Sequence, residues 1–246
     1  MKFRFSLLLN IFLVVLLAWT VSNKSAPAPP AAAAAPPPTS HIEGELDDFT
    51  YRYKVDSFAS RPVTKGGTVM LGDSLTDLGA WTEFFPGARI INRGISGDNT
   101  YGVLHRIDQV IAHKPAKVFL LVGTNDLFWN SSVEDAAARY SQILDKLRLA
   151  LPNAKIYVQS VPPFNRLPKG DYGYLDNAKA AALNTRINEL AVTAKAAYID
   201  LWPALANSSG QLDQRYTTDG IHLNGAGYAQ WVGVISKYIG ETQGGK

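Results

Sequence analysis

Residues 69–79 read VMLGDSLTDLG, an apolar run that ends in a glycine, an acid and a serine. The run has the length and composition of a buried β-strand, and the polar residues after it mark the point where the strand stops. A serine in that place is, taken alone, typical of a turn or of a helix cap. Its meaning therefore depends on what the rest of the chain brings to the same place.

Further apolar runs predict a sheet around this stretch. The predicted strands are TVML (68–71), ARII (88–91), KVFLLV (117–122), KIYVQS (155–160) and AYIDL (197–201). They are apolar on both faces, as buried parallel strands are. Between them, apolar residues recur with a helical period, as from Val133 to Leu147, Leu183 to Ala194 and Tyr228 to Ile239. This alternation predicts one three-layer α/β domain with a parallel sheet covered on both faces.

The composition narrows the class of protein. The chain has 246 residues, a formal net charge of +3 and no cysteine. Its basic and acidic residues are interspersed, so we expect no nucleic-acid partner. Without cysteine there is no disulfide, thiol nucleophile or thiolate metal site. The chain also lacks the motifs of α/β-hydrolases, P-loop proteins, dinucleotide-binding folds and zinc peptidases.

The first forty residues differ from the rest. Lys2 and Arg4 precede the uncharged segment 5–21, which has the length of a short membrane-spanning helix, and a proline- and alanine-rich stretch follows at 26–38. We therefore expect an anchor or signal segment at 1–25, a linker at 26–40 and a catalytic domain at 41–246. The positive flank predicts an exported domain, periplasmic or extracellular, that contacts the membrane through this segment only. The alternative is cleavage and secretion.

Polar residues follow three of the predicted strands. Ser74 follows the first strand, the loop 94–100 follows the second, and Asn125 follows the third. Ligand sites of open parallel sheets gather at the carboxyl ends of the strands, which favours a functional interpretation of these residues. The Gly97 N–H and the Asn125 amide can donate to a developing oxyanion, although each residue alone is typical of a turn.

A serine nucleophile needs a base, and the base needs an orienting group. Among the four histidines, His41 lies in the lead-in, whereas His105 and His113 lie in a predicted surface helix and are expected to be solvated or capping residues. His222 lies in a loop before the last predicted helix, three residues after Asp219. The pair can share a tight turn, with the carboxylate accepting from one ring nitrogen.

Four motifs occur in order on this frame: GDSL (72–75), the glycine of RGISGD (93–98), GTND (123–126) and DGIH (219–222). Jointly they resemble the SGNH hydrolases, also called the GDSL esterase/lipase family, over about residues 67–239. Within the family, INRGISGDNT (91–100) and VGTNDL (122–127) look most similar to the platelet-activating-factor acetylhydrolase-like and the bacterial lysophospholipase/arylesterase-like members. The resemblance implies a flavodoxin-like fold with a five-stranded parallel sheet between helices.

The resemblance also implies roles for the motif residues. Ser74 would be the nucleophile, His222 its general base and Asp219 the group that orients His222. The backbone N–H groups of Ser74 and Gly97 and the side chain of Asn125 would form the oxyanion hole. No cofactor and no metal are expected. Asp73, Asp98 and Asp126 accompany the motifs and are interpreted as loop-shaping hydrogen-bond partners.

The expected function is that of a serine esterase acting on acyl esters, above all short ones, in a small molecule or an envelope glycan. Aromatic residues near the motifs could hold a sugar ring or could pack in the core; they are Trp81, Tyr101, Phe128, Trp129, Tyr172 and Tyr174. A lysophospholipase, an envelope O-acyltransferase and an inactive binding module are the alternatives. The segment 162–177 matches no family motif and is the expected place of a specificity loop. No oligomeric state is predicted.

Overall fold

The computed structural model describes residues 48–168 and 172–240. The predicted anchor, the linker and His41 lie outside this part of the chain. Within it, no helix has both the length and the apolar character needed to cross a membrane. The longer helices are α3 (Phe49–Ala59), α6 (Thr100–Ile111), α8 (Val133–Ala150), α9 (Asn177–Thr193) and α11 (Gly225–Ile239). The shorter helices are α4 (Ser74–Asp77), α5 (Trp81–Phe84), α7 (Thr124–Phe128), α10 (Trp202–Leu205) and η2 (Gln214–Tyr216).

A five-stranded parallel sheet forms the centre of the fold. Its strands are β1 (Thr68–Gly72), β2 (Ile90–Gly94), β3 (Lys117–Leu121), β4 (Lys155–Gln159) and β5 (Ala197–Ile199), in the order β2-β1-β3-β4-β5. This is the flavodoxin-like order, so the predicted fold class is confirmed. The strand predicted at 88–91 begins two residues later and runs on to Gly94, because β2 pairs with β1 from Thr68↔Ile90 to Gly72↔Gly94.

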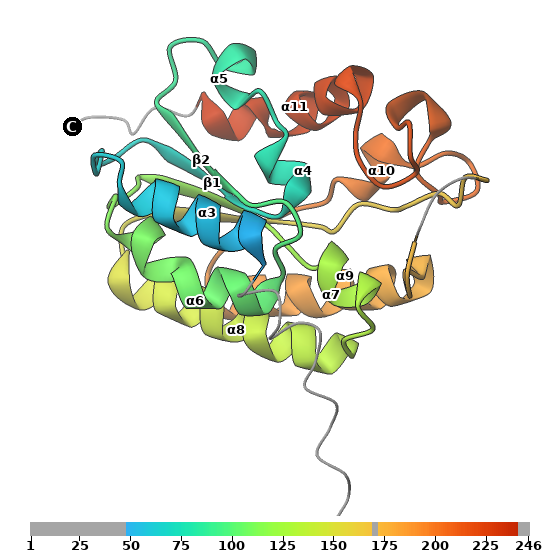
Figure 1. Ribbon diagram of the computed structural model, residues 1–246, viewed down its shortest axis with the longest axis horizontal. Helices are drawn as coiled ribbons and strands as arrows, with labels where there is room; N and C mark the ends of the chain where they lie inside the picture. Colours follow the sequence, from blue (N-terminus) through green and yellow to red (C-terminus); the bar gives the residue numbers. More distant parts are fainter. Residues whose placement is uncertain (1–47, 169–171, 241–246) are drawn as a thin grey trace, which may run out of the picture. The chain divides into compact units, whose positions relative to one another are not determined.

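Helices cover both faces of the sheet (Figure 1). On one face α6, α8 and α9 pack against Val69, Leu71 and the other β1–β4 side chains that point their way. On the other face Met70, Phe119 and Leu121 pack against Trp231 and Ile235 of α11. The alternation of β1 side chains between two cores explains why the strand is apolar at every position.

The carboxyl ends of three neighbouring strands coincide. Gly72 of β1 lies opposite Gly94 of β2 and Leu121 of β3. The loops that follow these strands therefore begin side by side. Gly72 permits this close approach, because a Cβ there would lie 2.0 Å from the Leu121 carbonyl oxygen. The predicted positions of Ser74, the 94–100 loop and Asn125 are thus brought to one edge of the sheet.

The lead-in to the sheet is the helix α3. The side chain of Asp48 caps its first turn by accepting from the N–H groups of Thr50 and Tyr51. Tyr51 and Phe58 are buried against the domain, whereas Phe49 and Tyr53 remain exposed. Helix α3 is therefore packed onto the domain by one face only.

Candidate active site

Ser74 is the first residue of α4, directly after the turn that ends β1. Asp73 caps this short helix, its Oδ1 accepting from the Leu75 N–H at 3.0 Å. The first N–H groups of a helix have no intrahelical acceptor, so the Ser74 N–H keeps its donor capacity. The Ser74 side chain is thereby held at the end of the sheet with a backbone donor beside it.

The loop before α11 brings His222 and Asp219 to Ser74. His222 Nε2 lies 3.0 Å from Ser74 Oγ, and His222 Nδ1 lies 2.7 Å from Asp219 Oδ2. The second oxygen, Asp219 Oδ1, accepts from the backbone N–H groups of Ile221 and His222. Gly220, which directly follows Asp219, has φ +90°, a left-handed conformation that glycine adopts without strain. The turn thus holds both oxygens of the Asp219 carboxylate by hydrogen bonds.

The electrostatics of this turn define the proton positions. Partial burial raises the pKa of Asp219, but the hydrogen bonds from His222 and from the backbone of Ile221 and His222 outweigh it and hold the pKa below its ordinary value. The ionised carboxylate can only accept, so Nδ1 carries the proton. Nε2 of a neutral His222 is then the acceptor for the Ser74 hydroxyl, as a general base requires.

Gly97 and Asn125 lie in the two loops beside Ser74. Gly97 has φ +86° and nothing within 4 Å of the position of a Cβ, so its backbone is open to an incoming group. Asn125 lies in α7, and its Nδ2 donates to the carbonyl oxygen of Asp98 at 2.8 Å. That bond fixes the amide plane with one of its two N–H groups, and the other is available to a substrate oxygen.

The site residues all lie within a stretch that matches a known protein family. Residues 70–230 match the model of the GDSL-like lipase/acylhydrolase family, a span that contains Ser74, Gly97, Asn125, Asp219 and His222. The chain belongs to the GDSL-like lipase/acylhydrolase family. The predicted SGNH resemblance is confirmed by this match.

Individual relatives agree with the family. The platelet-activating factor acetylhydrolase IB subunit alpha1 of Pongo abelii is 28% identical over 198 residues, which is 76% of this chain and 79% of the relative. A solved structure from Streptococcus pneumonia, provisionally described as a platelet activating factor, has a TM-score of 0.71 and 27% identity over 81% of this chain and 94% of its own. A GDSL-like lipase from Bacteroides thetaiotaomicron has a TM-score of 0.66 and 25% identity, covering 77% and 96% of the two chains.

Membership of the GDSL-like acylhydrolases makes this protein a hydrolase that acts on esters. In the part of the chain that the structure describes, no three histidine, aspartate or glutamate side chains are grouped as metal ligands. The side chains that the acylhydrolase brings together at the end of its sheet are those of a serine, a histidine, an aspartate and an asparagine.

Three buried aspartates shape the loops of the acylhydrolase site. Asp98 forms an ion pair with Arg106 of α6, and Asp126 accepts from the N–H and hydroxyl of Thr100. Burial raises the pKa of Asp98 to about 6 against the opposing effect of Arg106, and burial also raises the pKa of Asp126. Burial raises the pKa of Asp73 to about 8. The predicted loop-shaping contacts are thus present, each with a different partner.

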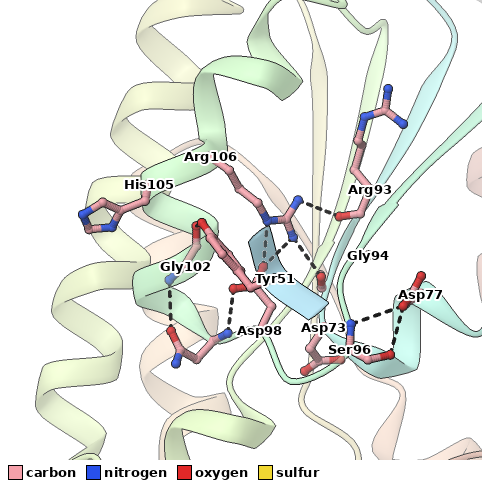
Figure 2. Close-up of polar contacts among 12 residues, drawn as sticks. Tyr51, Asp73, Asp77, Arg93, Gly94, Ser96, Asp98, Gly102, His105 and Arg106 are labelled. Carbon is pink, nitrogen blue, oxygen red and sulfur yellow. Dashed lines mark hydrogen bonds and ion pairs between the residues drawn. The ribbon is translucent and has the colours of Figure 1, made fainter. Parts of the chain in front are cut away.

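Arg106 was not singled out from the sequence, yet it connects the loops (Figure 2). Its guanidinium donates to Asp98 Oδ2, to the Arg93 carbonyl at 2.9 Å and to the Gly72 carbonyl at 3.0 Å. The side chain is buried on the same stripe of α6 as Val103 and Val110. A charged residue on an apolar helical stripe is the sequence signal that indicates such a buried cation.

The described parts of the predicted specificity segment, residues 162–168 and 172–177, support the loop that carries His222. Tyr172 donates from its hydroxyl to the Asp219 carbonyl at 2.9 Å, and the Asn165 N–H donates to the Gly220 carbonyl at 2.8 Å. Tyr174 in turn donates its N–H to the Phe128 carbonyl at the end of α7. Residues 172–174 therefore contact both the loop that carries His222 and the helix that carries Asn125.

Burial corrects one expectation from the sequence and distinguishes the two expected roles of the aromatic residues. His113 follows the end of α6 and is buried, with Nε2 2.8 Å from Arg93 Nη2, so it is not a solvated surface residue. Among the aromatic residues near the motifs, Trp81 and Tyr172 are buried and therefore pack in the core. Trp129 and Tyr174 are exposed, with 41% and 61% of their surface accessible.

Proposed function

We propose that this protein is a serine esterase that hydrolyses short acyl esters through Ser74, His222 and Asp219. Ser74 Oγ attacks the ester carbonyl carbon while His222 Nε2 takes the hydroxyl proton. The carbonyl oxygen becomes an oxyanion, which accepts from the N–H groups of Ser74 and Gly97 and from the Asn125 amide. The intermediate collapses, the ester C–O bond breaks, and His222 gives its proton to the leaving alcohol.

The second half of the reaction uses the same groups. A water molecule attacks the acyl-enzyme as His222 takes one of its protons, and the acid leaves when the bond to Ser74 Oγ breaks and the proton returns to Ser74. Asp219 holds Nδ1–H throughout and stabilises the imidazolium that forms. The single observation that carries this proposal is the continuous contact from Asp219 through His222 to Ser74.

A small apolar cavity supports the choice of short acyl groups. Its lining includes Leu75, Thr124 and Ile221. In the sequence these residues are the immediate neighbours of the proposed site residues Ser74, Asn125 and His222. Its volume is about 10 Å³, which is close to the space that one water molecule needs. A methyl group is of about the size of a water molecule, so the cavity suits an acetyl group. The name of the acetylhydrolase relative agrees with an acetyl ester.

The exposed aromatic residues support an acylated glycan as the larger substrate. Trp129 immediately follows α7, and its ring lies 4.9 Å from that of Phe128. Tyr174 donates its N–H to the carbonyl of the same Phe128. Two residues with exposed rings therefore lie at the end of the helix that carries Asn125, Trp129 by its ring contact and Tyr174 by its backbone. Flat aromatic surfaces with an apolar face and a polar edge suit the stacking of sugar rings.

The experiment that tests the proposal measures initial rates on nitrophenyl esters from acetyl to palmitoyl, with the full chain and its Ser74→Ala variant. Activity confined to acetyl and propionyl esters and lost in the variant is expected. A maximum at long chains would replace the short-chain esterase by a lysophospholipase or lipase. Transfer of acetate to an added sugar at the expense of hydrolysis would indicate an O-acyltransferase with the same site.

We also propose that residues 5–21 tether the exported domain to the cytoplasmic membrane. The proposal rests on the uncharged run behind Lys2 and Arg4 and on the proline-rich stretch at 26–38. Membrane fractions washed with alkaline carbonate are expected to retain the full chain, with its N-terminal segment intact. A soluble protein that begins after the alanine run would indicate cleavage and secretion instead.

A further inference from the structure

The orientation of the Gly97 N–H is set by a turn that links β2 to α6. The Asp98 N–H donates to the Ile95 carbonyl at 3.1 Å, which closes a β-turn with Ser96 and Gly97 at its centre. Gly97 has φ +86°, as the third residue of a type II turn requires. In a type I turn the peptide between the two central residues is turned over, so its N–H points the opposite way. The direction of this donor therefore depends on Ser96 being held in place.

One side chain holds Ser96 by two hydrogen bonds. Asp77 Oδ2 accepts from the Ser96 N–H at 3.2 Å and from Ser96 Oγ at 2.9 Å (Figure 2). Asp77 is the last residue of α4, the four-residue helix that begins with Ser74. The carboxylate thus joins the segment that carries the nucleophile to the residue that precedes the oxyanion donor.

The two segments lie in direct backbone contact at this point. A Cβ on Gly94 would lie 2.2 Å from the Asp77 backbone nitrogen, so glycine is needed for the approach. Asn92 bridges the same junction, donating from Nδ2 to the carbonyls of Thr76 and Asp77 and accepting from the Gly94 N–H. Asn92 fixes α4 to β2, whereas Asp77 reaches past the end of β2 to the turn itself.

The other oxygen of this carboxylate is occupied by the lead-in helix. Lys54 of α3 donates to Asp77 Oδ1 at 2.6 Å, and the two side chains are 29% and 13% exposed. The same helix also contacts the start of α6, where the Tyr51 hydroxyl donates to the Gly102 carbonyl at 2.9 Å. Helix α3 therefore contacts the chain on both sides of the turn that contains Gly97.

From these contacts we propose that Asp77 is a positioning residue for the reaction, acting through Ser96 to hold the Gly97 N–H toward the oxyanion, with Lys54 as its cationic partner. This inference rests on the proposed function, since it assumes that Gly97 donates to an oxyanion formed by Ser74. An oxyanion exists only after attack, so the effect falls on turnover rather than on substrate binding. Helix α3 then contributes to catalysis as well as covering the domain.

The test compares Asp77→Ala, Ser96→Ala and Ser96→Thr in the full chain, with nitrophenyl acetate as substrate and with rates normalised to the active-site titre. Asp77→Ala is expected to lower kcat by roughly 10–100-fold with KM little changed, because misplacing one donor forfeits part of its effect. Ser96→Ala should lower kcat less, since the bond from its N–H remains, and Ser96→Thr should restore it. Asp56→Ala, which removes an exposed carboxylate of α3, is the matched control.

The outcomes separate this inference from the proposed function. An unchanged kcat per titrated site in both Asp77→Ala and Ser96→Ala, beside an inactive Ser74→Ala, would overturn the positioning role and leave the esterase mechanism in place. Full activity in Ser74→Ala would overturn the mechanism itself. If Asp77→Ala does not fold, Ser96→Ala decides alone, because it removes one hydrogen bond without altering α4. A reduced rate of labelling by a fluorophosphonate, in proportion to kcat, is expected in the affected variants.

Discussion

His222 Nε2 lies 3.0 Å from Ser74 Oγ, although the two residues are 148 positions apart in the chain. Ser74 comes from the end of the first strand and His222 from the loop before the last helix, so the whole parallel sheet is needed to bring them together. Asp219 lies only three residues from His222 and is fixed by the same turn. The position of Ser74 relative to His222 is thus set by the whole fold, whereas the orientation of the His222 ring is set by the turn that contains Asp219.

Because Asp219 accepts from His222 Nδ1, we expect the Asp219 carboxylate to be needed for turnover. Asp219→Asn replaces an acceptor by an amide that can donate to Nδ1 and so favour the wrong tautomer of His222. We expect kcat for nitrophenyl acetate to fall by up to roughly 10⁴, with the protein still folded. Asp213→Asn, which alters a carboxylate that pairs with the exposed side chain of Arg215, is the control. Wild-type turnover in Asp219→Asn would remove Asp219 from the mechanism.

The Asn125 amide is expected to contribute to turnover. Removing one oxyanion donor costs on the order of 10²–10³ in rate in enzymes of this type. Asn125→Ala should therefore lower kcat by that amount, with a circular dichroism spectrum like that of the wild type. Asn153→Ala, at an exposed turn, should leave kcat unchanged. Equal rates in the two variants would show that Asn125 serves only to hold the Asp98 carbonyl.

Arg106 is expected to be a structural requirement. Arg106→Met leaves the Asp98 carboxylate buried without its cation and also removes donors from two carbonyls. Breaking a buried ion pair costs about 3–5 kcal/mol of the free energy of unfolding. Arg186→Met, which removes one side of the exposed pair with Glu189, should cost less than about 1 kcal/mol. Urea unfolding measures both values, and similar small losses would contradict the account.

Asp73 makes the stability depend on pH. Burial raises the pKa of Asp73 to about 8, and Oδ2 is buried without a hydrogen-bond partner among residues 48–168 and 172–240. Between about pH 4 and 8 the unfolded chain has lost this proton while the folded chain keeps it, so stability falls as pH rises. Asp73→Asn removes this titrating group and with it the loss of stability that the group causes as the pH rises. Its free energy of unfolding should therefore rise relative to wild type between pH 5 and 8, by at most about 1.4 kcal/mol per pH unit.

Urea unfolding at pH 5, 6, 7 and 8 provides the comparison. Asp98, whose pKa is raised to about 6, contributes with the same sign in both proteins, so only the difference between them reports on Asp73. A difference that is constant over this range, or that narrows as the pH rises, would contradict a protonated Asp73.

The exposed rings should affect large substrates alone. Trp129→Ala is expected to raise KM for an acetylated oligosaccharide several-fold, since a stacking contact is worth about 0.5–1.5 kcal/mol. Hydrolysis of nitrophenyl acetate should not change, because that ester carries no sugar ring to stack on Trp129. Leu149→Ala, at an exposed position of α8, controls for loss of surface apolar area. Equal KM changes for both esters would contradict a glycan-binding surface.

Much of the fold follows from local patterns. The five runs of apolar residues coincide with the five strands, because a parallel strand buried on both faces must be apolar throughout. The exceptions are the two edge strands. The bounds of β2 differ from the prediction by two or three residues, and β5 ends at Ile199, two residues before the predicted end. Strand β2 is only half buried, so its limits are set by pairing with β1 rather than by composition.

The residues of the candidate site also fall into those that the sequence predicts and those that it does not. Ser74, Gly97, Asn125, Asp219 and His222 stand in short motifs, and the sheet order then brings their loops together. The contacts that hold these loops could not be predicted. The apolar stripe of α6 indicates that Arg106 is buried but does not name its acceptors, and Lys54 and Asp77 meet only through tertiary contacts between distant segments. His113 is a similar case, since a histidine after a helix gives no sign that a buried arginine lies against it.

The central claim is that Ser74 is the nucleophile and that His222 activates it. The most direct measurement is the mass of the protein after reaction with a fluorophosphonate, followed by location of the adduct, in the wild type, Ser74→Ala and His222→Ala. We predict one adduct per chain on Ser74, none at that position in Ser74→Ala, and much slower labelling in His222→Ala. An adduct on another residue, or ester hydrolysis that persists at the wild-type rate in Ser74→Ala, would contradict the account.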